Sequence, residues 1–279
     1  MADVPPVFHF VFGLAPQREP MHLVHYLCLE SCRQVNRPAA MCLHYRHEPY
    51  GPWWDRIRPH LSLRRVGRAS AIPDPARYEA TEEGRVIRDS GWTYAHEADF
   101  LRLAILLDEG GIYADMDTLF VDTLPARWFE RDFVIGEEAP LAGPDGVLRV
   151  SLCNAFLVSR PRAAFARAWI ARMKEVFDGT WSRHSNQEAA QLWGEMPEAI
   201  HVVPQTCFYK HAATRRGVRT LFEGYDPGTA GVRSLHLWAH LWWDAWRTDF
   251  TRVHAGEIDE AYVRTRRTTY ATLARKFLD

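Results

Sequence analysis

Lysine is scarce in this sequence of 279 residues, although basic residues as a whole are not. Lysine and arginine together number 34, and only three of these are lysines, at positions 174, 210 and 276. Few residues are therefore available for any mechanism that needs a lysine. An excess of charge of one sign is lacking as well. The formal net charge is −1 at pH 7, which argues against a nucleic-acid partner held by bulk electrostatic attraction.

Long apolar runs are also absent. No stretch approaches the roughly 18 apolar residues that a membrane-spanning helix needs. The first residues, MADVPPVFHFVFG, contain no basic segment and only a short apolar run, so they differ from a secretory signal peptide. We therefore expect a cytoplasmic protein.

Cysteine occurs at five scattered positions, 28, 32, 42, 153 and 207. Cys28 and Cys32 are four residues apart, which is not the CxxC spacing of redox and zinc sites. Without a signal peptide, the sequence predicts reduced and mostly buried thiols.

The order of apolar segments predicts an α/β fold. The composition, 47% hydrophobic and 25% charged, is that of a globular protein, and the length suits one or two domains. Strands are expected at 7–13, 39–46, 61–67, 133–138 and 153–159, and helices at 21–36, 94–111 and 161–177. The strand–helix–strand opening indicates a parallel sheet. Residues 74–93 are predicted to be a loop with a short helix. Because no repeat or linker is visible, we expect a single domain over 1–279, with a last helix at about 257–278.

Two aspartates one residue apart follow the strongest predicted helix and its Gly110-Gly111 stop. Asp115 and Asp117 would share one side of a strand, where both carboxylates could bind a hard divalent cation and leave room for a phosphate oxygen. The motif alone is weak, because 17 aspartates produce about one Asp-x-Asp by chance.

The helix before this pair carries Asp99 and Arg102, which are i,i+3 neighbours on one face. One interpretation is a surface salt bridge that contributes little. The other is a pair that binds a polyol, since a carboxylate accepts and a planar guanidinium donates hydrogen bonds to adjacent hydroxyls.

The segment ADFLRLAILLDEGGIYADMDT resembles the signature of the Asp-x-Asp glycosyltransferases of family 32, S-D-x-x-R followed by an apolar helix and G-G-x-Y-x-D-x-D. The sugar-transferring domain of the large clostridial toxins shares this signature. The similarity covers residues 96–118, with Ala98 in place of the usual Ser.

Three shorter segments are similar to other elements of the family. HFVFG, at residues 9–13, resembles the first strand of the toxins, with Phe12 where an aromatic ring stacks on the nucleotide base. LHLWAHLWW, at 235–243, resembles H-H-W-A-x-S-W, with Leu241 in place of the Ser, and CNAFLVSRP contains Asn154. The Gly-Pro element of the family is not visible near 182–189. Each segment also has a plain structural interpretation: Phe12 as core, Asn154 as a partner of a buried backbone group, and the tryptophans at 238, 242 and 246 as a helical core stripe.

The resemblance implies a GT-A type nucleotide-binding sheet flanked by helices, and transfer of a sugar from a nucleotide-diphosphate donor with retention at the anomeric carbon. A UDP-sugar is favoured as donor, and a glycan or lipid-linked glycan is the expected acceptor, as in polysaccharide biosynthesis. Catalytic roles fall to Asp99, Arg102, Asp115 and Asp117. The nucleotide-sugar would contact Phe12, Asp99, Arg102, Asp115, Asn154 and Trp242.

Asp117 would bind the metal, Mn²⁺ or Mg²⁺. Leu241 cannot supply a ligand at the usual Ser position, so His236 is the expected second ligand, with His240 as the alternative. Imidazole favours Mn²⁺ over Mg²⁺.

Two other functions stay open at this point. DMDTL also fits the D-x-D-x-[TV] of haloacid-dehalogenase-type phosphatases, although a Gly-Gly stop precedes it and no Asp-Asp pair exists. A non-catalytic protein that binds carbohydrate or a nucleotide-sugar is the third interpretation. The arginines of the C-terminal helix form either a solvated face or a weak attachment to an anionic membrane.

Overall fold

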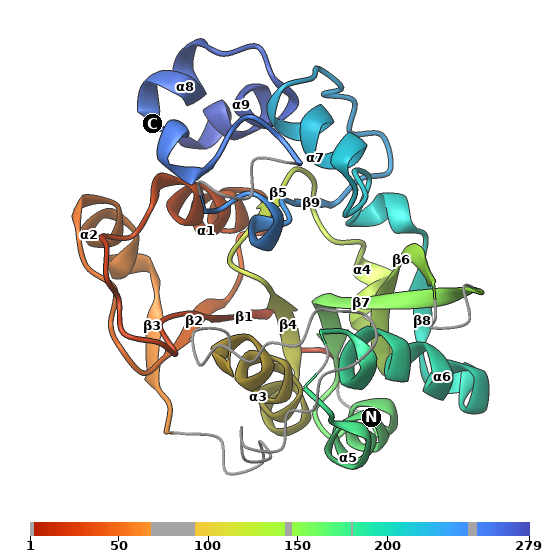
Figure 1. Cartoon of the computed structure of the whole chain (residues 1–279). Helices are drawn as coiled ribbons and strands as arrows, with labels where there is room; N and C mark the ends of the chain where they lie inside the picture. The colour runs from red at the N-terminus through yellow and green to blue at the C-terminus, as the bar shows by residue number, and fades with distance from the viewer. Residues whose placement is uncertain (1–2, 68–92, 143–146, 180, 245–249) are drawn as a thin grey trace.

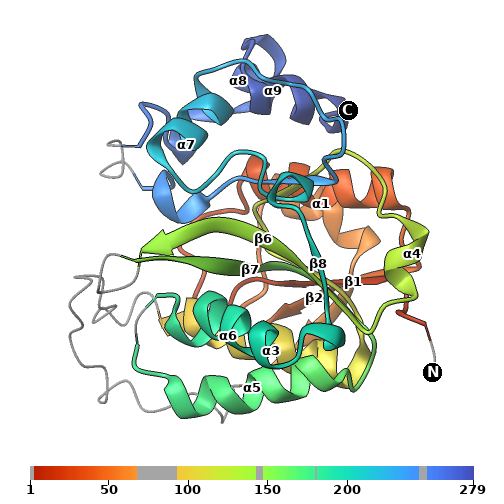
Figure 2. The ribbon, with the colours of Figure 1, turned by 90° about the vertical axis from the view of Figure 1, so that its right-hand side faces the viewer.

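A mixed sheet of seven strands lies at the centre of the molecule, with helices on both faces (Figures 1 and 2). The structure is a computed structural model, and it describes residues 3–67, 93–142, 147–179, 181–244 and 250–279. The strand order is β3-β2-β1-β4-β7-β6-β8. The strands are β1 (Val7–Val11), β2 (Ala40–Tyr45), β3 (Ser62–Arg65), β4 (Gly111–Ala114), β6 (Phe133–Ala142), β7 (Leu148–Ser159) and β8 (His201–Val203).

The first half of the sheet is parallel and the second half is mixed. β1 runs parallel to both β2 and β4, and β2 runs parallel to β3. β7 is antiparallel to its neighbours β4 and β6, and β8 is parallel to β6. A separate two-stranded sheet pairs β5 (Thr118–Phe120) with β9 (Ser234–His236). The predicted α/β class, a sheet flanked by helices, is confirmed, and so are the three strands of its parallel opening.

The helices form two layers. The helices are α1 (Leu23–Asn36), α2 (Pro52–Ile57), α3 (Thr93–Glu109), α4 (Ala126–Phe129), α5 (Ala164–Val176), α6 (Glu188–Glu195), α7 (Arg215–Phe222), α8 (Glu260–Thr265) and α9 (Thr269–Ala274). Figure 2 shows α3, α5 and α6 against one face of the sheet, and α1 on the other face with α7, α8 and α9 beyond it. None of the helices in the described part of the chain has both the length and the apolar character to cross a membrane.

Short helical turns connect these elements. The 3-10 turns are η1 (Arg58–His60), η4 (Pro197–Ala199), η5 (Gln205–Cys207), η6 (Ala239–Leu241), η8 (Ala255–Glu257) and η9 (Arg275–Phe277), and η3 (Arg183–Gln187) is a π-helical turn. The tryptophans of the HLWAHLWW segment therefore do not form a helical stripe in its described part. Trp238 has φ of 57°, and only a 3-10 turn follows it.

The stop after α3 depends on two glycines. Gly110 has φ of +69° and Gly111 has φ of +103°, and the Gly110 N–H donates to the carbonyl of Leu106. A Cβ at Gly111 would also lie 2.6 Å from the carbonyl oxygen of Val7 in β1. Since other residues disfavour positive φ, the two glycines let the chain turn from the helix directly into β4.

The C-terminal segment differs from its prediction. Instead of one helix at about 257–278, α8 and α9 are separate, because Arg266 is extended with ψ of 144°. The Thr268 side chain then accepts from the Ala271 N–H and starts α9 as its N-cap. Two of the arginines expected on one face are engaged within the chain, Arg264 by Glu260 and Arg275 by the carbonyl of Val263.

The loop predicted over 74–93 falls almost wholly outside the described residues. The single-domain organisation over 1–279 stays a prediction.

Candidate functional site

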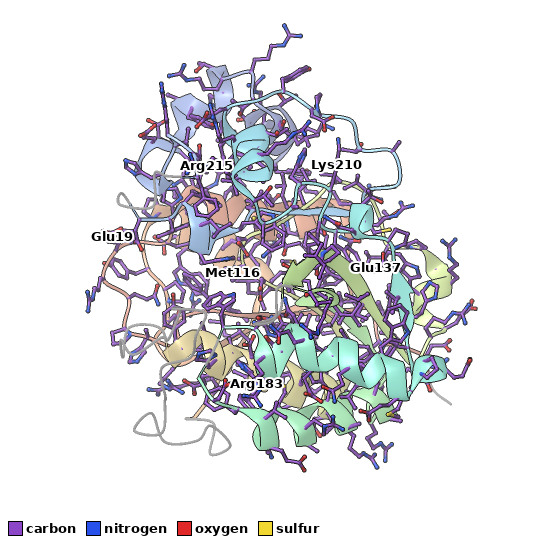
Figure 3. All side chains as sticks on the ribbon, turned by 45° about the vertical axis from the view of Figure 1, so that its right-hand side comes forward. Glu19, Met116, Glu137, Arg183, Lys210 and Arg215 are labelled. Atoms are coloured by element: carbon purple, nitrogen blue, oxygen red, sulfur yellow. The ribbon has the colours of Figure 1, made fainter. Side chains whose placement is uncertain are left out.

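The aspartate pair lies in a tight turn between β4 and β5. β4 ends at Ala114, and the Thr118 N–H donates to the carbonyl of Asp115 to close the turn. The expectation that both residues belong to one strand is therefore wrong, although their carboxylates do lie close together. The Asp115 N–H still donates to the Ala155 carbonyl of β7, and the turn places both carboxylates at the end of β4. Figure 3 shows Met116, the residue between them, near the centre of the molecule.

His236 joins the pair through a second strand. β5 and β9 are antiparallel, and their register places His236 opposite Thr118, next to Asp117. The His236 Nδ1 atom lies 3.4 Å from Asp117 Oδ1. The Ala239 N–H donates to Asp117 Oδ2 at 2.8 Å and so orients the carboxylate. Ligand atoms of Asp115, Asp117 and His236 all lie within 4.8 Å of one another.

The Nδ1 atom of His236 is placed where it could bind a metal ion. Its side chain is 7% exposed, and Nδ1 is buried without a hydrogen-bond partner among the described residues. Buried polar atoms are nearly always hydrogen-bonded, and a nitrogen without such a bond beside two carboxylates fits a ligand to a cation. The alternative ligand, His240, is not in this group of the described chain. Its ring lies 5.0 Å from that of Trp181.

Asp99 and Arg102 form a buried network, so a simple surface salt bridge is excluded. Arg102 Nη2 lies 3.0 Å from Asp99 Oδ1 and 3.3 Å from Asp115 Oδ1. Its Nη1 donates to the Asn154 carbonyl at 2.7 Å. The Asn154 side chain in turn donates to Asp99 Oδ1 at 2.7 Å. One guanidinium therefore connects α3, the aspartate turn and β7.

Asp115 is held from its own strand as well. The Tyr113 hydroxyl donates to Asp115 Oδ1 at 2.6 Å, and the Tyr113 ring lies under the Arg102 guanidinium at 4.6 Å. Burial raises the pKa of Asp115, Arg102 lowers it, and Asp117 raises it further, so that the net shift is upward. This cost of keeping the charged form is offset when a cation binds between the two carboxylates. The tyrosine of the G-G-x-Y-x-D-x-D signature could have indicated Tyr113, because residues i and i+2 of a strand share a face.

His184 is a site residue that the sequence does not predict. It is 0% exposed, and its Nε2 lies 2.9 Å from Asp99 Oδ2. It belongs to η3, the π-helical turn, and such turns are frequent at functional sites. No local signal distinguishes this histidine from a core residue. His96, Asp99 and His184 could also hold a cation by their proximity, but the Arg102 guanidinium already pairs with Asp99.

Aromatic rings gather beyond the metal-ligand candidates. The rings of Phe12 and His25 are 4.7 Å apart, and the His25 ring stacks on Trp243 at 4.7 Å with an interplanar angle of 19°. Phe12 follows β1 and is partly buried, as a ring that contacts a base requires. The sequence did not indicate His25 or Trp243, which come from α1 and the segment after η6.

The structure corrects the prediction that Trp242 contacts the nucleotide-sugar. It is 0% exposed, its indole N–H donates to the Leu237 carbonyl, and its ring lies 4.4 Å from that of Phe222. A ring enclosed on all sides cannot contact a nucleotide-sugar. Leu241, at the usual Ser position, is also buried. The partly exposed ring of this segment is Trp243.

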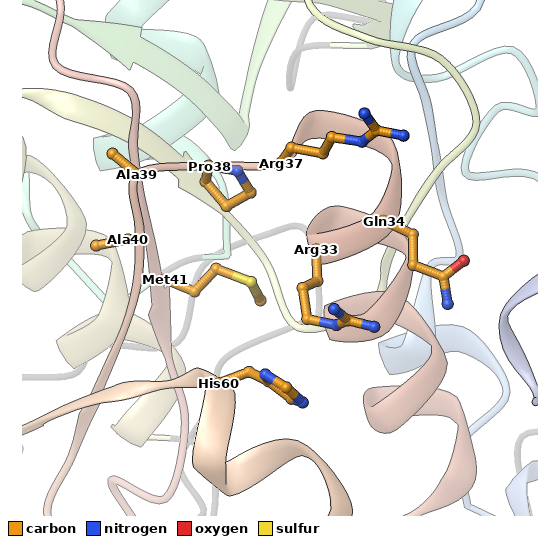
Figure 4. Close-up of a pocket in the computed structure, with 8 residues that line it drawn as sticks. All are labelled: Arg33, Gln34, Arg37, Pro38, Ala39, Ala40, Met41 and His60. Atoms are coloured by element: carbon orange, nitrogen blue, oxygen red, sulfur yellow. The ribbon is translucent and has the colours of Figure 1, made fainter.

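A separate open pocket of about 590 Å³ lies at the N-terminal end of β2 (Figure 4). Its lining includes Arg33, Arg37 and His60, with Ala40 and Met41 from the first residues of β2. The aspartate turn follows the last residue of β4. Because β2, β1 and β4 are parallel, this turn lies at the opposite ends of the strands from the pocket. Arg33 is already paired with Glu30 at 2.5 Å. This pocket is therefore not part of the site.

Comparison with known proteins matches residues 64–137 to the family model described as the glycosyltransferase sugar-binding region containing DXD motif. A curated relative, glucan organizing enzyme 1 of Cryptococcus neoformans var. grubii, is 31% identical over 245 residues, which are 85% of this chain and 63% of that protein. This chain thus spans less than two thirds of the length of that relative.

Solved structures with a similar course of the chain include the galactosyltransferase LgtC in complex with donor and acceptor sugar analogues, with 14% identity, a TM-score of 0.48 and coverage of 97% of this chain and 95% of that one. The PaToxG glycosyltransferase aligns with 16% identity, a TM-score of 0.46 and coverage of 70% and 71%. The structure of this chain has the predicted sheet flanked by helices, with the aspartate pair directly after a strand.

Proposed function

We propose that this chain is a glycosyltransferase of the type whose sugar-binding region contains a DXD motif, and that it transfers a sugar from a nucleotide-diphosphate donor to a hydroxyl acceptor. The proposed reaction depends on a divalent metal and retains the configuration of the anomeric carbon, with a UDP-sugar as the favoured donor. The observation that carries the proposal is the cluster of Asp115, Asp117 and His236, with its orphaned buried imidazole nitrogen.

The residues of this cluster fit a divalent cation. Two carboxylates and one imidazole supply oxygen and nitrogen ligands, and the nitrogen favours Mn²⁺ over Mg²⁺. We propose that Asp117 and His236 bind the ion directly and that Asp115 faces both the ion and the donor. When bound, such an ion neutralises charge that develops on the leaving diphosphate.

Asp99 and Arg102 are proposed to orient the donor sugar. The side chain of Asp99 is 12% exposed and receives three partners, Arg102, Asn154 and His184. Its position is therefore fixed before a sugar arrives, which is what an orienting group needs. Asn154 would act on the sugar only through Asp99, because its side-chain N–H already donates to that carboxylate.

Retention is proposed to proceed without a protein nucleophile. Both oxygens of Asp99 accept hydrogen bonds or pair with Arg102, and Asp115, which is held through Oδ1 by Tyr113 and Arg102, is assigned to the ion and the donor, so neither carboxylate is proposed as a nucleophile. In the proposed reaction the leaving diphosphate takes the proton of the incoming hydroxyl. Among the aromatic residues, Phe12 is proposed to contact the base, together with His25 and Trp243.

The phosphatase alternative is not favoured by any feature of the site. Its nucleophile would be Asp115, the first aspartate of the motif, and that carboxylate is engaged by Tyr113 and Arg102. The nearest lysine that follows the motif, Lys174, is in α5 on the other side of the sheet from the C-terminal helices.

The acceptor is proposed to be a glycan, with a lipid-linked glycan at a membrane surface as one class to be tested. The cytoplasmic location expected from the sequence stays a prediction.

The test is hydrolysis and transfer with a panel of UDP- and GDP-sugars, with and without Mn²⁺. We expect activity with Mn²⁺ only, and loss of at least about 100-fold in Asp117→Asn, since a direct ligand would be replaced by a neutral amide. Asp55→Asn, at an exposed position of α2, is the matched control and should leave activity unchanged. Metal-independent turnover, or wild-type turnover by Asp117→Asn, would refute the proposal.

A further inference from the structure

A second carboxylate, Glu138, lies in β6 outside the donor machinery described above. Glu138 is partly buried, and its Oε2 atom accepts from the Asn186 amide at 2.6 Å and from the Ser151 hydroxyl at 3.2 Å. Within the described chain no lysine or arginine pairs with it, and no hydrogen bond reaches its Oε1. Burial raises the pKa of Glu138, and the bonds from Asn186 and Ser151 lower it only in part. A half-buried carboxylate without a cation is costly, and such groups gather at functional sites.

Glu138 faces the same side of the sheet as the metal-ligand candidates. Gly136, two residues earlier and in regular register with β7, would bring a Cβ within 2.8 Å of the Tyr209 ring. The Tyr209 ring lies 6.0 Å from that of His236. Residues i and i+2 of a strand share a face, so the Glu138 side chain points towards the region of Tyr209 and His236.

Glu138 and the aspartate turn both contact β7, at different positions. Ser151 is opposite Glu138, and the Ala155 carbonyl accepts from the Asp115 N–H. Among the described residues, the side-chain hydrogen bonds of Glu138 go to Asn186 and Ser151, and to none of Asp99, Arg102, Asp115 and Asp117. Glu138 therefore lies beside the residues assigned to the donor without belonging to their network, as a group that binds the acceptor should.

We propose that Glu138, oriented by Asn186 and Ser151, is the hydroxyl-binding carboxylate of a saccharide acceptor subsite. The inference rests on the proposed function and names its acceptor side. Oε1 accepts a hydrogen bond from an acceptor hydroxyl, while the two bonds to Oε2 hold the carboxylate in place. A carboxylate is well suited to bind a sugar hydroxyl, because hydrogen bonds to ionised groups are roughly twice as strong as those between neutral groups.

The turn η3 links this subsite to the donor site. Its His184 contacts Asp99 and its Asn186 contacts Glu138, so this one turn positions a carboxylate of the donor site and the carboxylate of the proposed subsite.

The test compares Glu138→Gln with Glu137→Gln, a matched control at the next position of β6, on the opposite face of the strand and labelled in Figure 3. Donor hydrolysis by water is measured beside transfer to a panel of methyl glycosides and disaccharides. Binding of the same saccharides is followed by saturation-transfer NMR, which needs no turnover. Thermal unfolding shows that each variant is folded.

For Glu138→Gln we expect KM for the saccharide to rise at least about tenfold, as for loss of a charged hydrogen bond, and transfer to fall far more than hydrolysis. Glu137→Gln should match the wild type in both. Equal losses of hydrolysis and transfer, or unchanged saccharide binding in folded Glu138→Gln, would overturn the inference. If wild-type protein hydrolyses no donor, the proposed function fails by itself, and the NMR arm still decides whether Glu138 binds saccharide.

Discussion

Replacing Arg102 by lysine tests whether the site depends on a planar fork or only on a positive charge. The guanidinium pairs with Asp99 and Asp115 and donates to the carbonyls of Asn154 and Ala98, all with its side chain 6% exposed. A lysine has one nitrogen, which cannot reach both carboxylates and both carbonyls together. Arg102→Lys therefore leaves at least one buried acceptor without a donor.

The size of the effect follows from these contacts. Loss of one charged hydrogen bond costs about 1.5–3 kcal/mol, and an unsatisfied buried acceptor costs about 1–3 kcal/mol. We expect Arg102→Lys to lower the free energy of unfolding by about 3 kcal/mol or more. Arg102→Ala, which leaves two carboxylates without their cation, should lower it by about 3–5 kcal/mol. Sugar transfer should fall at least about tenfold for each lost contact to a hydroxyl, in both variants, while nucleotide affinity changes much less.

Urea unfolding followed by tryptophan fluorescence gives the stability, and donor hydrolysis with saturating Mn²⁺ gives the activity. Arg167→Lys, the same change at an exposed position of α5, is the control and should alter neither. If Arg102→Lys unfolds and hydrolyses donor like the wild type, the fork has no role and the reasoning from its contacts is wrong.

Three further predictions concern histidines. His236→Ala should raise the Mn²⁺ concentration needed for half-maximal hydrolysis at least about tenfold, whereas His240→Ala should not; an equal effect of both would exclude selective ligation. His184→Gln keeps a donor for Asp99 and should retain more kcat than His184→Leu at a similar KM, and no rescue by Gln would mean that His184 is only core. Burial, together with His9 and Arg64, lowers the pKa of His44 in the folded protein to about 3. As the pH falls below about 6.5, His44 therefore takes up a proton in the unfolded chain and not in the folded one, so the free energy of unfolding decreases. At pH 5 this amounts to about 2 kcal/mol relative to pH 7, and His44→Phe should lose less than the wild type in urea unfolding.

The sequence by itself determined the elements whose signals are local. The apolar periodicity of α3 and its Gly110-Gly111 stop, the buried runs of β1, β2 and β7, and the spacing from Asp99 to Asp117 can all be recognised within a few turns of chain. The resemblance to the Asp-x-Asp glycosyltransferases rests on this spacing, which depends on neighbours in sequence only. Local signals failed where tertiary context decides, as in the break at Arg266 between α8 and α9.

Tertiary structure alone decided which distant side chains join these motifs. His236 lies beside Asp117 because β9 pairs with β5, and nothing in either segment specifies that register. His184 lies near the site because η3 packs against β7, the strand that carries both Asn154 and Ser151, and Glu138 lies there because β6 pairs with β7.

Tertiary packing also explains why Trp242 is buried whereas Trp243, the next residue in the sequence, is partly exposed. The chain leaves η6 so that one indole fills the core against Phe222 and the next stacks on His25. Both residues are tryptophans, and they have nearly the same neighbours in sequence. Only the packing of α1 and α7 around them determines which ring is enclosed and which can meet a ligand.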